Sequence, residues 1–93
     1  MKLLFDTAKS ERNARERGLP FDRAADFDWA HARVSEDERH DYGERRLIAM
    51  SQLDGRIHVL CFVPVPGGFR VISLRKANMR EVRKYEETTP ADE

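Results

Sequence analysis

The sequence predicts an α+β fold, with helices at the N-terminus, an antiparallel sheet in meander order, and a short C-terminal helix. Three observations support this class. Polar segments with helix-capping signals come first, three apolar runs separated by tight turns follow, and a capped basic segment comes last. Because 93 residues bury only one modest core, we expect a single domain over residues 1–87 and a disordered acidic tail over residues 88–93.

The N-terminal segment predicts a short edge strand and then a helix. The strand is expected from Lys2 to Phe5. Asp6 can cap a helix that runs to about Arg17, and Gly18 stands where a glycine commonly ends a helix. The helix is polar and rich in basic residues. It is therefore either a solvated helix or one that borders a ligand or partner surface.

A second helix is expected after the break at Leu19-Pro20-Phe21, with Asp22 as its cap. Its apolar side should face the core rather than form a base-stacking surface. The residues of that side are Ala24, Ala25, Phe27 and Trp29. Residues 30–35 predict a further strand, and residues 36–44 predict a polar loop.

Three strands with clear turn signals follow, at Arg45–Leu53, Arg56–Val65 and Phe69–Arg75. Asp54-Gly55 is a strong two-residue hairpin signal, because glycine tolerates positive φ. Pro66-Gly67-Gly68 marks the second turn. The middle strand is apolar on both faces, so we expect it in the centre of the sheet, covered on both sides for part of its length.

The third strand runs directly into a short basic helix. Asn78 is a predicted N-cap with Glu81 three residues later, which is a capping-box arrangement. Cations gather around this strand-to-helix junction, namely Arg75, Lys76, Arg80, Arg83 and Lys84. The N–H groups at a helix N-terminus also attract anions. The junction is therefore a candidate phosphate-binding site.

The overall charge excludes a uniformly basic nucleic-acid-binding coat, since 17 basic and 17 acidic residues cancel. Local RNA contact is still possible because the charges cluster. No apolar run reaches the roughly 20 residues that span a bilayer. The run Met1–Phe5 is too short for the apolar core of a signal peptide. We therefore expect a cytoplasmic protein without membrane contact.

The cysteine and the histidines indicate structural rather than chemical roles. Cys61 is the only cysteine, so it has no disulfide partner within the chain, and its apolar neighbours should raise its pKa. His58 is expected to be a core residue, and His31 and His40 to be exposed. No histidine has a neighbour at metal-ligand spacing, so we expect no metal and no other cofactor.

Three motifs in order resemble the BrnT toxin family. The C-terminal signature I-S-x-R-x-A-x-x-x-E-x-x-x-Y is matched by Ile72, Ser73, Arg75, Ala77, Glu81 and Tyr85. The opening pattern of the family is matched by Asp6, Lys9, Asn13, Gly18, Phe21 and Ala24, and its middle segment by Tyr42, Gly43, Glu44 and Arg46. The resemblance covers about residues 3–87. One departure is Arg17, which stands where the family usually has histidine before the glycine.

The resemblance implies both a fold and a function. BrnT proteins are RelE-like ribonuclease toxins of bacterial type II toxin–antitoxin modules, with a curved antiparallel sheet and flanking helices. They degrade RNA and thereby stop translation. A BrnA-type antitoxin neutralises them, generally in a complex with two copies of each protein. DNA is contacted only indirectly, through the antitoxin.

Metal-independent RNA cleavage through the 2′-hydroxyl needs a base, an acid and cations that stabilise the phosphorane. Arg75 and Arg80 are the candidates for the cationic role, because arginine grips phosphate with a planar fork. Glu44 is the candidate base, and Tyr85 can act as the acid or stack on a base. RNA contact is expected from Lys9, Arg45, Lys76, Arg83 and Lys84.

Each candidate also has a structural interpretation. Arg75 and Arg80 can form salt bridges, and Glu44 can be a turn carboxylate paired with an arginine. Tyr85 can pack its ring on the sheet with its hydroxyl in water, and Glu81 is a helix cap rather than a base. Two functional alternatives follow from these interpretations. One is a catalytically degenerate antitoxin-binding module, and the other is a regulator that binds nucleic acid without cleaving it.

Overall fold

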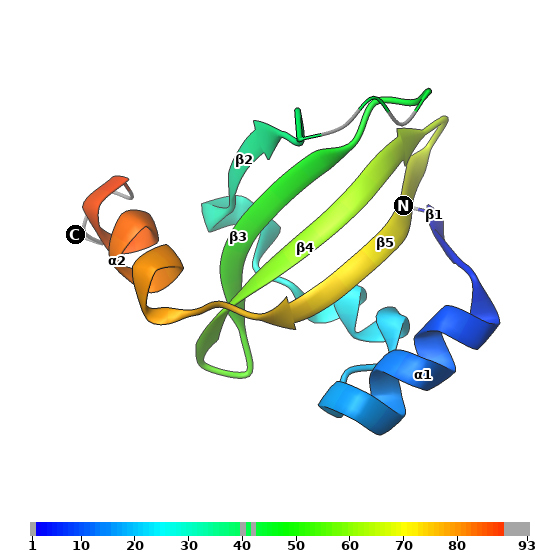
Figure 1. Cartoon of the computed structure of the whole chain (residues 1–93), viewed down its shortest axis with the longest axis horizontal. Coiled ribbons are helices and arrows are strands. Elements are labelled where there is room, and N and C mark those ends of the chain that lie inside the picture. Colours follow the sequence, from blue (N-terminus) through cyan, green and yellow to red (C-terminus); the bar gives the residue numbers. More distant parts are fainter. Residues whose placement is uncertain (1, 40, 42, 89–93) are drawn as a thin grey trace.

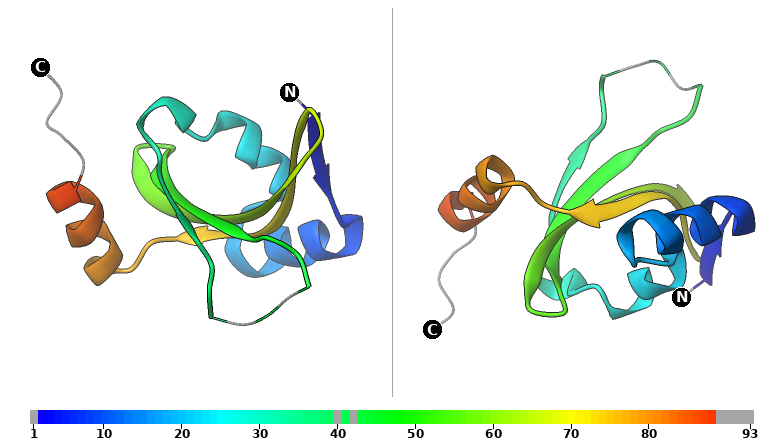
Figure 2. Two further views of the ribbon diagram at one scale, coloured as in Figure 1. Left: turned by 90° about the horizontal axis from the view of Figure 1, so that it is seen from above. Right: turned by 60° about the horizontal axis from the view of Figure 1, so that its bottom comes forward.

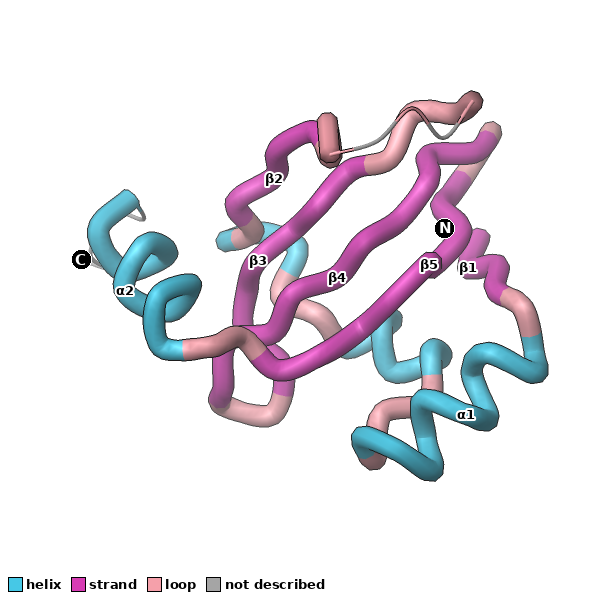
Figure 3. The backbone as a smooth tube through the Cα atoms, viewed as in Figure 1, coloured by secondary structure: helices cyan, strands magenta, loops and turns pink. Residues whose placement is uncertain are grey.

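The computed structural model describes residues 2–39, 41 and 43–88. One five-stranded sheet forms the centre of the fold (Figure 1). Its strands lie in the order β1 (Lys2–Phe5), β5 (Gly68–Lys76), β4 (Arg56–Val65), β3 (Leu47–Leu53) and β2 (Arg33–Glu36). In sequence, α1 (Thr7–Arg17) and two short helices lie between β1 and β2, and α2 (Met79–Thr88) follows β5. Figure 3 marks the helices and strands by colour. The predicted α+β class is confirmed.

The first helix, α1 (Thr7–Arg17), begins and ends as predicted. The Asp6 carboxylate accepts a hydrogen bond from the backbone N–H of Lys9 at 3.0 Å. Gly18 ends the helix with a φ of 69°, in the left-handed region. None of the described helices is long and apolar enough to cross a membrane.

The predicted second α-helix is wrong in type, because two short 3₁₀ helices occupy its place. They are η1 (Phe21–Asp26) and η2 (Trp29–His31). Asp22 lies inside η1, and the N-cap is Pro20, which makes no side-chain cap. The buried residues Phe21, Ala24 and Phe27 recur every third residue. A helix with three residues per turn places all three against the sheet, which explains the observed form.

The expected core position is confirmed for Ala24, Phe27 and Trp29 but is wrong for Ala25, which is exposed. Phe27 is buried, and Trp29 is partly buried against the main core cluster. The Trp29 ring packs on Phe27, Phe62 and Phe69 with centroid distances of 4.9 to 5.4 Å. The strand expected over residues 30–35 is β2, which begins later and is exposed along its length.

The antiparallel meander from β2 to β5 is confirmed. The sheet as a whole is mixed, however, because β1 pairs with the start of β5 in parallel orientation. β1 lies so close to β5 that a Cβ on Gly68 would overlap the carbonyl group of Lys2. The β1 pairing ends at Val71, and no other strand of the described residues pairs with the outer edge of β5 beyond it.

The turns and the central strand agree with the prediction. Asp54 and Gly55 both have positive φ, at 54° and 75°, as a tight hairpin turn requires. β4 is buried from Ile57 to Val63. β3 begins two residues later than expected, and β5 extends one residue beyond the expected strand at each end.

The two faces of the sheet differ in their cover. One face holds the main core, which includes Leu60 and Leu74, and packs against the N-terminal segments. The other face has a smaller cluster in which Ile57 and Val59 contact Tyr85 of α2 (Met79–Thr88). Figure 2 shows η1 and η2 on one side of the curved sheet and α2 beyond its end. We call the α2 side of the sheet, outside the contact with α2, the open face.

The C-terminal prediction is confirmed at its start and adjusted at its end. Asn78 accepts a hydrogen bond from the Glu81 backbone N–H, and the Glu81 carboxylate accepts one from the Asn78 N–H, each at 2.9 Å. This is a capping box. Thr88 belongs to α2, and the rest of the expected tail, residues 89–93, lies outside the described residues.

Candidate nucleic-acid interface

Arg75 lies at the end of β5 with its side chain on the α2 side of the sheet, next to the open face. It pairs in register with Val59 of β4 and therefore shares a face with it. Its guanidinium donates to both carboxylate oxygens of Glu81, at 2.8 and 2.9 Å. These hydrogen bonds raise the pKa of Arg75 and lower the pKa of Glu81. Glu81 thus serves both as a helix cap and as the partner of Arg75, so the salt bridge expected as the structural interpretation of Arg75 is present.

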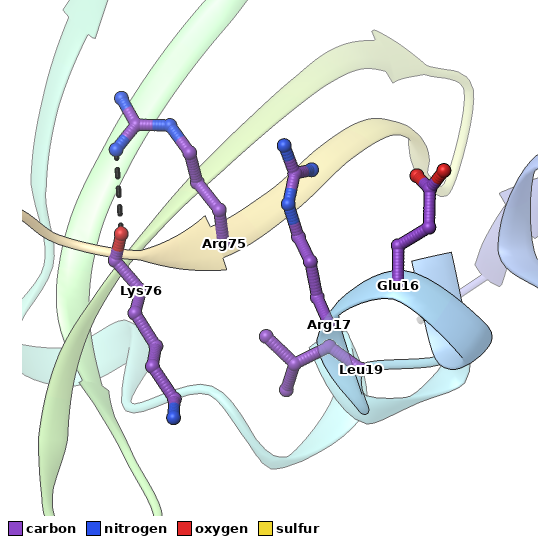
Figure 4. A pocket seen from close by; sticks show the side chains of 5 residues that line it. All are labelled: Glu16, Arg17, Leu19, Arg75 and Lys76. Carbon is purple, nitrogen blue, oxygen red and sulfur yellow. Dashed lines mark hydrogen bonds between the residues drawn. The ribbon is translucent and has the colours of Figure 1, made fainter. Parts of the chain in front are cut away.

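A cleft of about 400 Å³ separates the end of α1 from the end of β5 (Figure 4). We call it the Arg75 cleft. Its lining residues are Glu16, Arg17, Leu19, Arg75 and Lys76. In Figure 4, the side chains of Arg17, Arg75 and Glu16 extend in the same general direction, and Lys76 extends the opposite way. Two guanidinium groups and one carboxylate therefore lie on one side of the cleft.

Asn13 holds α1 in this position. Its amide nitrogen donates to the carbonyl oxygens of Leu19 at 2.6 Å and Leu74 at 2.9 Å. Its amide oxygen accepts from Arg17 at 3.0 Å. Asn13 is buried, so these bonds satisfy polar groups that water does not reach. One buried amide thus fixes the helix against β5 and orients Arg17 beside the cleft.

The structure shows where Arg17, the departure from the family pattern, lies in the fold. Sequence comparison identified it only as arginine in place of the usual histidine. In the fold it lines the same cleft as Arg75, although 58 positions separate the two residues in the numbering of the chain. No short-range sequence pattern connects them, because the position of α1 beside β5 places both residues at one cleft.

A second charged cluster on the open face was missed in the sequence. The Asp37 carboxylate is fully buried, and the Arg39 guanidinium donates to both of its oxygens at 2.8 Å. The Cys61 thiol lies 3.9 Å from the same carboxylate. Burial, together with the nearby Asp37 charge, raises the pKa of Cys61. The predicted buried position of this cysteine is confirmed. Arg39 is also close enough to Arg75 to oppose its positive charge.

The structure does not bring Glu44 to Arg75. The Glu44 carboxylate accepts from Arg70 at 2.7 Å and from Arg46 at 3.4 Å. Arg70 precedes Arg75 by five residues on β5, which is roughly 17 Å at ~3.4 Å per residue. Glu44 is therefore a paired carboxylate at the far end of the open face. Arg45 is ion-paired with Glu36 at 2.8 Å.

The Tyr85 hydroxyl is hydrogen-bonded to His31 rather than to Arg75. Tyr85 is buried, its ring belongs to the small cluster under α2, and its hydroxyl donates to the carbonyl of His31 at 3.0 Å. His31 precedes β2, and three strand spacings separate β2 from β5. The hydroxyl is therefore hydrogen-bonded to backbone, which differs from the water-exposed hydroxyl of the structural interpretation.

The remaining candidate residues are exposed, both Arg80, which was predicted for the cationic catalytic role, and the predicted RNA-contacting residues. Arg80, Arg83 and Lys84 lie on the outer side of α2, and Lys9 lies on α1. Among the described residues, Arg80 has no ion-pair partner, so its expected salt bridge is not seen. Helix periodicity and capping place these cations on the solvated face of a helix. Those signals do not identify the ligand that the face binds.

The histidines and possible metal ligands complete the survey. His58 is buried and its Nδ1 lies 2.8 Å from the carbonyl oxygen of Arg56, as expected for a satisfied core residue. His31 is exposed and pairs with Asp28. His40 and Tyr42 lie outside the described residues. Within residues 2–39, 41 and 43–88, no group of three or more potential ligands could hold a metal ion.

Comparison with known families identifies the family of the chain. A family model described as the ribonuclease toxin BrnT of type II toxin–antitoxin systems matches residues 5–81. No curated protein matches the sequence. The matched segment includes α1, the strands β2 to β5 and the start of α2, and it contains every residue that lines the Arg75 cleft. The chain therefore belongs to the BrnT family of ribonuclease toxins of type II toxin–antitoxin systems.

Proposed function

We propose that the chain is a metal-independent endoribonuclease that cleaves RNA through the 2′-hydroxyl and thereby inhibits translation. The observation that carries this proposal is the Arg75 cleft, where Arg17 and Arg75 lie beside the carboxylate of Glu16. Two guanidinium groups can bind one phosphate and stabilise the charge that grows on its oxygens. A carboxylate beside them can accept a proton.

Glu16 is the proposed general base. Among the described residues it has no ion-pair partner, whereas Glu81 is occupied by Arg75 and by the Asn78 N–H. Glu16 would take the 2′-hydroxyl proton as the 2′-oxygen attacks phosphorus. The bond from phosphorus to the 5′-oxygen then breaks, and water in the open cleft protonates that oxygen. The products are a 2′,3′-cyclic phosphate and a 5′-hydroxyl.

Arg75 and Arg17 are the proposed phosphate-binding groups. Substrate phosphate would compete with Glu81 for the Arg75 fork, since both offer two oxygens in similar geometry. Arg80, Arg83 and Lys84 would contact RNA outside the cleft from the exposed side of α2. We do not propose Glu44 or Tyr85 as proton-transfer groups, because their partners hold them away from Arg75.

Family membership implies an antitoxin partner. We propose a BrnA-type antitoxin, in a complex with two copies of each protein, that blocks the toxin in the cytoplasm. DNA would be contacted by the antitoxin rather than by this chain, whose charges sum to zero. Mixing the purified proteins and measuring the mass of the complex by light scattering tests both the pairing and the stoichiometry.

Purified protein and single-stranded RNA test the catalytic proposal. We expect cleavage in the presence of EDTA, with cyclic phosphate ends, and no cleavage of strands with 2′-deoxy sugars. Arg75→Gln or Arg17→Gln should slow cleavage by about 10²-fold, and Glu16→Gln by about 10²-fold or more. Arg15→Gln removes an exposed charge from the same helix outside the cleft and should have little effect.

The outcomes separate the proposed enzyme from its alternatives. Intact RNA after incubation with folded native protein would exclude the nuclease. If that protein still binds the antitoxin, it is a binding module without catalysis. Cleavage that EDTA abolishes would refute metal independence. Equal cleavage rates of Arg15→Gln and Arg17→Gln would exclude the proposed role of Arg17 in binding the substrate phosphate.

A further inference from the structure

A second hollow of about 220 Å³ continues from the Arg75 cleft along α1. The two hollows share Glu16 and Arg17 as lining residues. Beyond them, the second hollow is lined from α1 by Lys9, Arg12 and Asn13, and from β5 by Ile72 and Ser73. We call this second hollow the α1 groove. Because the hollows adjoin, a ligand chain can pass from one into the other.

Helix periodicity explains why the groove is basic. Positions 9, 12, 13, 16 and 17 are spaced by three and four residues, so they form one face of α1. Asn13 turns that face toward β5 through its bond to the Leu74 carbonyl. The face brings Lys9, Arg12 and Arg17 to the groove against one carboxylate, Glu16. Lys9 and Arg12 have no ion-pair partner among the described residues, so their charges are available to a ligand.

The sheet leaves space for this groove. β1 pairs with β5 only as far as Val71, and the next residue, Ile72, forms a bulge where the register with β4 shifts. A longer β1 would cover the edge of β5 where Ile72 and Ser73 line the groove. The short first strand and the bulge therefore open a channel between α1 and β5.

We propose that the α1 groove binds the phosphodiester backbone of single-stranded RNA on one side of the phosphate held in the Arg75 cleft. This inference rests on the proposed function. Lys9 and Arg17 are eight residues apart, or about 12 Å at ~1.5 Å per residue, so the groove extends beyond one phosphate. Phe21, the groove's aromatic residue, is buried. Without an exposed ring on which bases can stack, the groove recognises backbone charge and gives little base preference.

Binding of uncleavable RNA tests this proposal. The probe is fluorescein-labelled single-stranded RNA with 2′-O-methyl sugars, which lacks the attacking hydroxyl, in a dinucleotide and a longer form. Fluorescence anisotropy gives Kd across a range of salt concentrations. We expect the longer strand to bind more tightly than the dinucleotide. For the longer strand, Arg12→Gln should reduce the magnitude of the salt slope by about 0.7, and Lys9→Gln with Arg12→Gln by about 1.4.

Arg15→Gln is the matched control, since it also removes one arginine from α1 but lies outside the groove. It should leave the salt slope of the longer strand unchanged, and all variants should bind the dinucleotide as the native chain does. Equal effects of Arg12→Gln and Arg15→Gln would overturn the proposal, as would a native chain that gains no affinity with strand length. Weaker antitoxin binding in Arg12→Gln, with RNA binding unchanged, would identify the groove as a protein-binding surface instead.

The test separates this inference from the proposed function. If the native chain leaves unmodified RNA intact but binds the longer strand through Arg12, the proposed RNA cleavage is refuted and the proposed RNA binding in the α1 groove is supported. If the native chain cleaves RNA while Arg12→Gln and Arg15→Gln bind the longer strand alike, the proposed RNA cleavage is supported and the proposed RNA binding in the α1 groove is refuted.

Discussion

Glu81 has two structural roles that substitution can separate. Its carboxylate accepts the Asn78 N–H of the capping box and also both Arg75 hydrogen bonds. Glutamine can occupy the same capping-box position, so Glu81→Gln keeps the cap and removes the charge. Glu81→Ala removes both. The difference between the two variants measures the cap, and the difference between native chain and Glu81→Gln measures the charge.

The expected magnitudes follow from the partial exposure of the pair. The side chains of Arg75 and Glu81 are 38% and 23% exposed, so solvent screens the pair and it contributes about 0.5 kcal/mol. A negative charge in the first turn of α2 adds about 0.5 kcal/mol. The lost capping hydrogen bond costs about 1 kcal/mol more. Glu81→Gln should therefore cost about 1 kcal/mol, and Glu81→Ala about 2 kcal/mol.

Urea unfolding at several pH values tests these numbers. Because the pKa of Glu81 is lowered in the folded chain, its charge stabilises the fold fully above the unfolded pKa of about 4.3. That contribution disappears as the pH falls through the folded pKa. The native chain and Glu81→Gln should thus differ at neutral pH and converge in acid. A Glu81→Gln cost that equals the Glu81→Ala cost, or that persists in acid, would refute this division of roles.

Three further predictions concern stability and activity. Gly68→Ala should lower the free energy of unfolding by about 1 to 3 kcal/mol, because its Cβ would push β1 from β5; the same unfolding midpoint as native would contradict this packing. Asn13→Asp should cost about 3 kcal/mol in urea unfolding, since it leaves two buried carbonyls without a donor, whereas a cost below about 1 kcal/mol would mean that α1 is held otherwise. Tyr85→Phe should cost about 1 kcal/mol through the lost bond to backbone and leave RNA cleavage unchanged; a large loss of cleavage in a stable variant would return its hydroxyl to the reaction.

Much of the fold could be predicted because its signals are local. The cap at Asp6, the glycine at Gly18 and the capping box at Asn78 each depend on backbone groups within a few residues. The turn at Asp54-Gly55 requires positive φ, which the glycine permits. The second helix was predicted in the wrong form, because core packing at a three-residue spacing outweighed the general signals of an α-helix.

The candidate site could be predicted only in part. The sequence singled out Arg75 and its basic surroundings, and it identified the family through motifs at fixed spacing. It did not indicate that Arg17 and Glu16 would share a cleft with Arg75, and it overlooked the pair of Asp37 and Arg39. Residues that are close in space but distant in sequence meet because of strand register and helix packing. Both depend on the whole fold, so the sequence around each residue does not reveal them.

The sequence by itself determined the caps, the turns, the buried central strand and the family, since each arises from the chemistry of neighbouring residues. The tertiary structure decided which charges meet. It paired Glu44 with Arg70, occupied Arg75 with Glu81, and brought Arg17 to the same cleft through the buried amide of Asn13. Ion pairs and hydrogen bonds form only over a few ångströms, so the roles of these charged side chains follow from the partners that packing supplies.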